Sequence, residues 1–193
     1  AAGLTPSRGC EIDDLGKKVM RRFHPKVKLD SDYRSTSWAS WRPTSNQLLL
    51  VTGSPACQTL AVGGKQNLAD ARTMQTRQFV SIGAIAGASI IGMEQVSELD
   101  TLDHVHGLLT DLNMDAMHLG YVMLGKSTLR HSQVGGLSSR HRTFPSWEHK
   151  DMHMVLPDPE PVVWMWQKQG SLSTVLIDSD CPDSHCIDLS QGH

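Results

Sequence analysis

Residues 120–127 read G-Y-V-M-L-G-K-S, a stretch whose residue types and spacing fit a known chemistry. It satisfies G-x-x-x-x-G-K-[ST], in which backbone N–H groups cradle phosphates, the lysine reaches the β- and γ-phosphates and the hydroxyl binds Mg²⁺. Asp178 follows a short apolar run, as does the acidic residue that helps to hold the metal in such enzymes. The pattern therefore predicts a Mg-nucleotide site formed by Gly120, Gly125, Lys126, Ser127 and Asp178.

The surroundings of this motif also allow an accidental match. Its four variable positions hold Tyr, Val, Met and Leu, whereas a loop that wraps closely around a phosphate needs small residues. The preceding residues 113–119 are polar with a helical pattern, and the phosphate-binding motif follows a strand. The alternative to a nucleotide site is therefore a helix or helix end that happens to carry these letters.

Cysteine and histidine gather near the end of the sequence in the spacing C-x3-H-C-x6-H. These residue types bind Zn²⁺, and a structural zinc site needs four of them in a tetrahedron. The predicted ligands are Cys181, His185, Cys186 and His193. Because the paired short spacings of most zinc motifs are missing, the alternative is a polar tail without metal.

No Ser/His/Asp or Cys/His nucleophile motif is visible in the sequence. G-x-S-x-G does not occur, and no cysteine has a recognisable signature around it. We therefore predict no catalytic residues, and this favours a binding or structural role over an enzymatic one.

Basic side chains cluster in two zones, residues 17–28 and residues 126–150, of a chain whose net charge is −2. Local cations of this kind neutralise phosphates in nucleic-acid complexes, although a nearly neutral chain exerts no global attraction. The predicted nucleic-acid contacts are Lys17, Lys18, Arg21, Arg22, Lys26, Lys28, Arg140 and Arg142. The alternative is an ordinary solvated helix face with cations near its carboxyl end.

The uncharged run from Gln78 to Met93 is the stretch around which the other elements are organised. It is shorter than the about 20 apolar residues of a membrane span, and Arg77 and Glu94 bracket it. Beyond it, apolar residues recur every three or four positions as far as Leu124, which is typical of helices. We therefore predict a central helical core over residues 66–126. The residues expected to be buried in it are Ile82, Ile85, Ile90 and Leu99.

The remaining patterns predict an α+β fold. Residues 11–23 have the spacing of a short amphipathic helix, with acidic residues first and basic residues last. Residues 47–52 and 59–62 predict a small β-hairpin, and residues 152–178 predict a C-terminal β-meander.

The length of 193 residues suits one domain with extensions. We predict a single α+β domain over residues 1–178, with an extended loop at 30–46, followed by a tail over residues 179–193. No secretory signal peptide is visible, and no run is long enough to span a membrane, so we expect a soluble protein.

Trp38, Trp41 and Trp147 lie in polar stretches with no apolar periodicity of their own. Interfaces are enriched in tryptophan, which points to contacts with partners. We therefore predict a non-enzymatic structural or interaction protein, an oligomeric subunit of a larger assembly such as a coat, virion, matrix or complex. Its expected partners are copies of itself, other protein chains or RNA. The alternative is a small P-loop-type nucleotide- or phosphate-binding enzyme that uses Lys126, Ser127 and Asp178.

Overall fold

The computed structural model describes residues 5–44, 47–58, 60–61, 71–101, 103–130 and 140–152. The chain divides into two compact units, one of residues 1–128 and 141–156 and the other of residues 129–140 and 157–193. The first unit holds all the elements below except the end of strand β6. The predicted single domain over 1–178 with a tail over 179–193 stays a prediction.

A small α/β element begins the described chain. Strands β1 (Arg8–Cys10) and β2 (Lys28–Asp30) pair in parallel, and helix α1 (Asp14–Phe23) connects them. Parallel strands need such a crossover because the end of one strand and the start of the next lie at opposite edges of the sheet. The Asp13 carboxylate accepts the Gly16 N–H at 2.7 Å and so caps the helix that the pattern over residues 11–23 predicts.

Helix α1 turns its main apolar stripe to solvent. Met20 lies against β1, where a Cβ on Gly9 would meet the Met20 methyl carbon at 3.7 Å. The exposed stripe consists of Ile12, Leu15, Val19 and Phe23, and Leu15 and Phe23 are each 69% accessible. The helix therefore contacts β1 through Met20, on the side next to this stripe.

The chain's own backbone and side chains hold the first two tryptophans. The 3₁₀ helix η1 (Trp38–Trp41) places their ring centroids 4.7 Å apart. Trp38 Nε1 donates to the Tyr33 carbonyl oxygen at 2.9 Å, and Trp41 Nε1 donates to the Asp30 carboxylate at 3.3 Å. Both rings are half-buried. This packing removes the burial argument for an assembly at residues 30–46.

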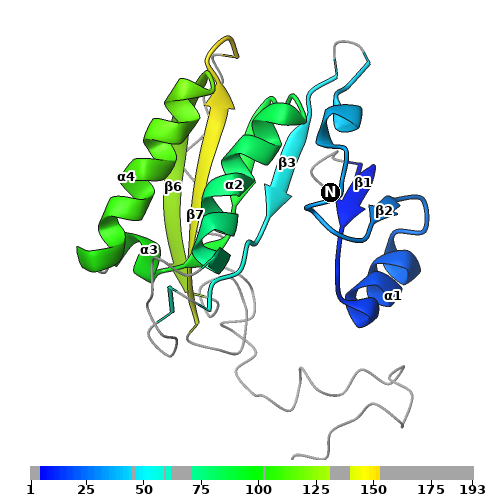
Figure 1. The fold of residues 1–193 in the computed structure, drawn as a ribbon, viewed down its shortest axis with the longest axis horizontal. Coiled ribbons are helices and arrows are strands. Elements are labelled where there is room, and N and C mark those ends of the chain that lie inside the picture. Colours follow the sequence, from blue (N-terminus) through cyan, green and yellow to red (C-terminus); the bar gives the residue numbers. More distant parts are fainter. Residues whose placement is uncertain are drawn as a thin grey trace, which may run out of the picture. The chain divides into compact units, whose positions relative to one another are not determined.

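The central sheet combines parallel and antiparallel strands. Its strands are β3 (Leu50–Gly53), β4 (Ile90–Met93), β5 (Gln95–Val96), β6 (Tyr121–Arg130) and β7 (His141–His149). The order is β3-β4-β7-β5, and β6 pairs with β7. Figure 1 shows β6 and β7 side by side. β3 and β4 run parallel, whereas β7 runs antiparallel to β4 and β5. The fold is mixed α/β.

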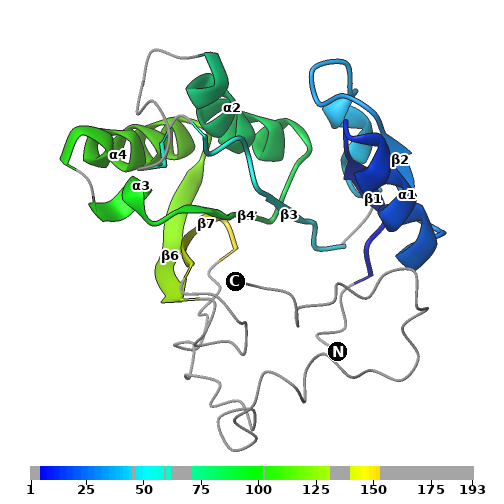
Figure 2. The same ribbon diagram turned by 90° about the horizontal axis from the view of Figure 1, so that it is seen from below.

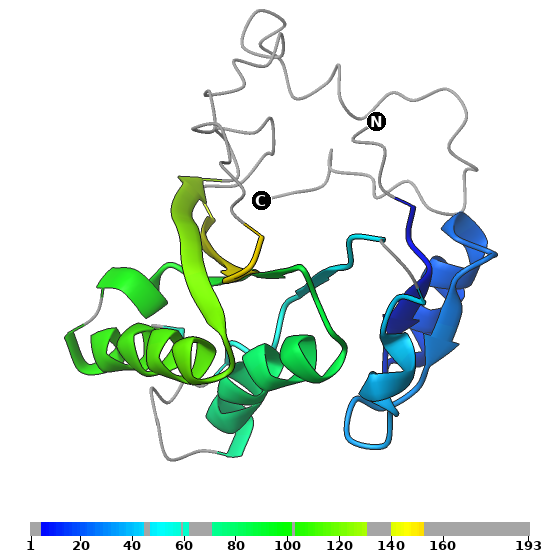
Figure 3. The ribbon, with the colours of Figure 1, turned by 90° about the horizontal axis from the view of Figure 1, so that it is seen from above.

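Helices cover one face of this sheet. α2 (Ala71–Ile85) and α4 (Asp103–His118) lie side by side on it, and the short α3 (Glu98–Thr101) contacts α4 (Figures 2 and 3). α2 forms the crossover between the parallel strands β3 and β4. Buried side chains from both layers form the core, among them Val80, Ile91, Leu112 and Trp147.

The predicted central helical core over residues 66–126 is not confirmed. Residues 90–93, 95–96 and 121–130 are strands, so the uncharged run leaves helix α2, turns at Gly87 and continues as β4. A short apolar run fits a buried helix and a buried strand equally well, which is why periodicity alone misassigned it. Leu99 is buried as predicted, whereas Ile85, the last residue of α2, is 47% exposed.

The predicted β-hairpin also differs from the structure. β3 pairs with β4, and of the predicted return strand the described residues 60 and 61 are not part of a strand. Apart from residue 152, the predicted β-meander over residues 152–178 lies outside the described residues. None of the described helices is long and apolar enough to cross a membrane.

Candidate functional site

The carboxyl ends of β3 and β4 meet at one edge of the sheet because the two strands are parallel. In open α/β sheets, ligands bind in the crevice beyond such strand ends. At this edge β3 leads into residues 54–58, and β4 leads into Glu94 and β5. We therefore expect functional side chains in these two connections.

Cys57 lies in the connection after β3 as a free, half-buried thiol. Its carbonyl oxygen accepts the N–H groups of Leu60 at 2.9 Å and of Ala61 at 3.0 Å, so the residue begins a tight turn. Its side chain packs beside the hydrophobic core, in which Leu60 is fully buried. A thiol fixed in this way at a strand end is a candidate nucleophile, which reacts as the thiolate.

Glu94 and Arg142 form an ion pair at the same edge. Arg142 Nε lies 2.6 Å from Glu94 Oε1, and the Arg142 side chain is 18% accessible. The β5–β7 pairing places Arg142 opposite Val96. The Glu94 N–H donates to the Gly53 carbonyl oxygen at 2.9 Å. The charge-assisted ion pair orients the Glu94 carboxylate, and the backbone bond places Glu94 next to the end of β3.

Gln95 joins the two connections from a buried position. Its amide nitrogen lies 3.4 Å from the Pro55 carbonyl oxygen and 3.4 Å from Thr76 Oγ1. Its amide oxygen accepts the Val96 N–H at 2.9 Å. The two connections thus carry a thiol, a carboxylate and a buried amide, and Arg142 on β7 pairs with the carboxylate.

Only Arg142 of these residues belongs to the sites that the sequence predicts, and it appears there as a nucleic-acid contact. A usable signal is nevertheless present: one apolar strand is followed by S-P-A-C-Q, and a second apolar run is followed by E-Q-V. If both runs are parallel neighbours, the two connections reach the same edge of the sheet. Interpreting residues 90–96 as helix concealed this relation.

The predicted nucleotide site is not formed. The residues before Gly120 belong to helix α4, and Gly120 makes the turn into β6 with a φ of 84°. Gly125, Lys126 and Ser127 lie within β6, where the backbone is extended and does not wrap around a phosphate. Asp178 lies outside the described residues. The P-loop alternative is therefore wrong, because its motif falls on helix, turn and strand in place of strand, loop and helix.

The predicted nucleic-acid contacts fall on several elements. Those of residues 17–28 lie on α1, the turn after it and the start of β2, and most are exposed. Lys17 differs, with its ammonium 3.0 Å from Asp14 Oδ1 and its side chain 15% accessible. Arg142 pairs with Glu94, while Arg140 precedes β7. Nucleic-acid binding by these residues stays a prediction.

The predicted zinc ligands Cys181, His185, Cys186 and His193 lie outside the described residues. Within the described ranges, no three or more His, Cys, Asp and Glu side chains gather in a way that could hold a metal ion. The zinc site therefore stays a prediction.

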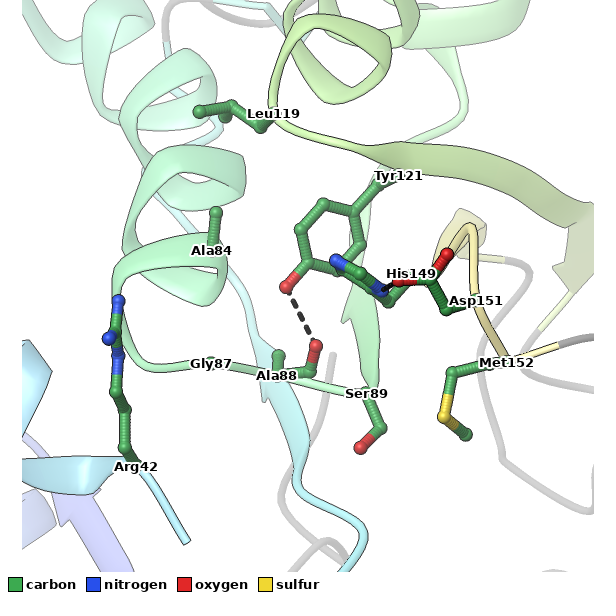
Figure 4. Close-up of a pocket in the computed structure, with 10 residues that line it drawn as sticks. All are labelled: Arg42, Ala84, Gly87, Ala88, Ser89, Leu119, Tyr121, His149, Asp151 and Met152. Carbon is green, nitrogen blue, oxygen red and sulfur yellow. Dashed lines mark hydrogen bonds and ion pairs between the residues drawn. The ribbon is translucent and has the colours of Figure 1, made fainter.

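A cavity of about 380 Å³ lies at the opposite edge of the sheet, beside the amino end of β4 (Figure 4). Its polar groups contact one another. Tyr121 Oη donates to the Ala88 carbonyl oxygen at 2.7 Å, and His149 Nδ1 lies 3.5 Å from Asp151 Oδ2. Burial raises the pKa of the Tyr121 phenol, so that it stays a donor. The Tyr121 bond joins β6 to the residues after α2, and the His149–Asp151 contact lies at the end of β7.

The arrangement of these elements is similar to that in solved structures of methyltransferases. A protein assigned as a DNA modification methyltransferase encoded within a prophage (E. coli) superposes with a TM-score of 0.61 and 16% identity, over 81% of this chain and 44% of that chain. A variant of Spodoptera frugiperda DNMT2 gives 0.53 and 17%, over 77% and 44%. The Entamoeba histolytica methyltransferase EhMeth gives 0.55 and 13%, over 79% and 45%. The chain thus spans less than half the length of these structures. No protein-family description and no curated protein matches it.

This fold contradicts the prediction of a non-enzymatic structural subunit of a coat, virion or matrix. The three solved structures are methyltransferases, and therefore enzymes. The prediction also rested on Trp147 needing a partner, yet Trp147 is fully buried and its Nε1 donates to Asn113 Oδ1 at 2.8 Å. Because side chains alternate across a strand, the polar stretch that forms β7 can still bury a tryptophan on its inner face.

Proposed function

We propose that this chain takes part in the methylation of a nucleic-acid base, and that the base binds at the carboxyl edge of β3 and β4. The fold supports the reaction class, and the side chains at this edge support the way in which the base is activated. The observation that carries the proposal is the placement of Cys57 and the Glu94–Arg142 pair in adjacent connections, which the Glu94 N–H bond to Gly53 joins.

A thiol is useful for methylation at a ring carbon because a pyrimidine carbon is by itself a weak nucleophile. We assign Cys57 as the nucleophile that adds, as thiolate, to C6 of cytosine. The C5=C6 electron pair then shifts to form a C4=C5 bond while N3 takes a proton. A methyl donor such as S-adenosylmethionine supplies a methyl cation to C5 and leaves as a neutral thioether. Loss of the N3 and C5 protons and elimination of the thiolate restore the C5=C6 bond.

Glu94 suits the Watson–Crick edge of cytosine. Its acid form donates a proton to N3, and its carboxylate form accepts from the 4-amino group. Arg142 orients this carboxyl group through the 2.6 Å contact. A base within a duplex would have to leave the stack to reach the site. We assign no donor-binding residue in this chain.

The test is hydrogen exchange at C5 of cytosine, which reports base activation without a methyl donor. The protein is incubated in deuterated water with single-stranded DNA, duplex DNA and RNA oligonucleotides, and deuterium uptake at C5 is measured by mass spectrometry. We expect exchange with the wild type and none with Cys57→Ser, because a hydroxyl is a far weaker nucleophile. Glu94→Gln should slow exchange by about a hundredfold, the order that a positioned acid contributes.

Cys10→Ser is the matched control, because Cys10 is also free and half-buried but lies on β1. This variant should exchange at the wild-type rate. Absence of exchange with every oligonucleotide, or equal exchange in Cys57→Ser, would overturn the proposal. Transfer of labelled methyl groups from S-adenosylmethionine, measured in parallel, reports the complete reaction.

A further inference from the structure

We propose that Gln95 is a positioning residue, which holds the connection carrying Cys57 in register with the Glu94–Arg142 pair. The effect of Gln95 on catalysis rests on the proposed function. Whether Gln95 holds the connection that carries Cys57 can be tested without that function.

Two consecutive residues bond the chain at the end of β3 and in the connection just beyond it. The Glu94 N–H donates to the Gly53 carbonyl oxygen at 2.9 Å, at the end of β3. The Gln95 side chain reaches the Pro55 carbonyl oxygen at 3.4 Å, beyond the last paired residue of β3. The second bond therefore acts where the strand ladder no longer fixes the backbone, close before Cys57.

The Gln95 amide has its hydrogen-bonding groups engaged within the fold, which fixes its orientation. The residue is 1% exposed. Its nitrogen serves Pro55 and Thr76 Oγ1 on α2, and its oxygen accepts the Val96 N–H. Buried amides whose donors and acceptors are satisfied have few alternative rotamers. The side chain is therefore a rigid link.

The same link leads to the guanidinium. Val96 lies opposite Arg142 in the β5–β7 pairing. The Gln95 side chain thus bonds Pro55 before Cys57 and Thr76 on α2. It also bonds Val96, which lies opposite Arg142 in the β5–β7 pair. A reaction that needs the thiol and the carboxyl group on one base depends on their spacing, and a misplacement of about 1 Å costs about a hundredfold in rate.

The experiment compares Gln95→Met, which keeps the length of the side chain, with Gln95→Asn, which keeps the amide but shortens its reach. Thr76→Val is the matched control, because it removes the other acceptor of the Gln95 amide and leaves the Pro55 bond possible. Two rates are measured for each variant: alkylation of Cys57 by iodoacetamide, resolved by peptide mass spectrometry, and C5 hydrogen exchange of cytosine. Cys10 in the same samples is the internal standard for general loosening.

We expect the two rates to move in opposite directions. Freeing the connection should make Cys57 alkylation several-fold faster in both Gln95 variants while Cys10 is unchanged. Exchange at C5 should fall by about a hundredfold, because the spacing between the connection that carries the thiol and Glu94 is no longer fixed. Thr76→Val should change both rates much less than the two Gln95 variants do. A merely structural role would accelerate Cys10 alkylation as well.

An unchanged rate of Cys57 alkylation in both Gln95 variants would show that Gln95 does not hold the connection that carries Cys57. Equal acceleration of Cys10 and Cys57 would contradict this role as well, since it would show general loosening. If the wild type shows no exchange with any oligonucleotide, the proposed function fails, and the alkylation rates still decide whether Gln95 holds the connection.

Discussion

At the scale of single residues, Cys10 and Cys57 show how surroundings give a thiol its chemistry. Both are free and half-buried. Burial raises the pKa of Cys10, and nearby carboxylates raise it further, while a hydrogen bond with Thr36 lowers it. Because the thiolate is the nucleophile, a raised pKa makes Cys10 less reactive near neutral pH. Cys57 differs in its place, because it lies in the connection after β3, next to the connection that begins with Glu94.

Asp32 offers a titration that checks the local electrostatics. Hydrogen bonds from the Arg34 side chain and backbone lower the pKa of Asp32 from 3.8 to about 2. Since the folded pKa lies below the unfolded one, this group's contribution to stability is complete above pH 3.8 and is lost as the pH falls toward about 2. We expect NMR of the Asp32 carboxyl carbon to give this pKa, and Arg34→Ala to raise it toward 3.8. If the pKa of Asp32 is the same in the wild type and in Arg34→Ala, Arg34 does not lower it, and the prediction is wrong.

At the scale of elements, α2 and β4 approach each other closely. A Cβ on Gly83 would lie 2.6 Å from both Cδ1 and Cγ1 of Ile91. The absence of a side chain at Gly83 allows this approach, and the neighbour is a strand.

Gly83→Ala should therefore destabilise the protein by about 1–3 kcal/mol through overpacking, although alanine is the better helix former. Gly107→Ala on α4 is the matched control, because nothing lies within 4 Å of the added Cβ. It should stabilise by about 0.5–1 kcal/mol. Urea unfolding measures both changes. Similar effects of the two alanines would show that the Gly83 contact is not tight.

At the scale of the whole molecule, charge limits how the protein can approach a nucleic acid. The net charge of −2 provides no overall attraction, so any phosphate contact has to be local. The exposed cations of α1 are the described group best suited to it, since they stand on one helix beside the start of β2.

Substitution of these cations should be visible in the salt dependence of binding. Lys18→Gln and Arg22→Gln should each reduce the slope of log K against log salt by about 1 if each contacts one phosphate. Fluorescence anisotropy of a labelled oligonucleotide over a series of salt concentrations measures this slope. Lys17→Gln is the control, because Lys17 pairs with Asp14 and is 15% accessible. Slopes that match the wild type in both test variants would assign binding to another surface.

Much of what is local in this protein could be predicted from the sequence alone. Helix α1 lies within the predicted residues 11–23, because its cap and its charge order act within a few turns. The apolar run that ends at Gly53 does form a strand. The close packing at Gly83 also follows from residue size. Each of these features depends on neighbours in the sequence.

Only the tertiary structure decided that residues 90–96 are strand and that β4 lies parallel to β3. That pairing brings Cys57 and Glu94 into adjacent connections and makes a candidate site from residues without a sequence motif. It also buries Trp147 in a stretch whose composition is polar. Strand direction and register depend on contacts between distant segments, whereas apolar periodicity reports only which residues avoid water and leaves helix and strand unresolved in short runs.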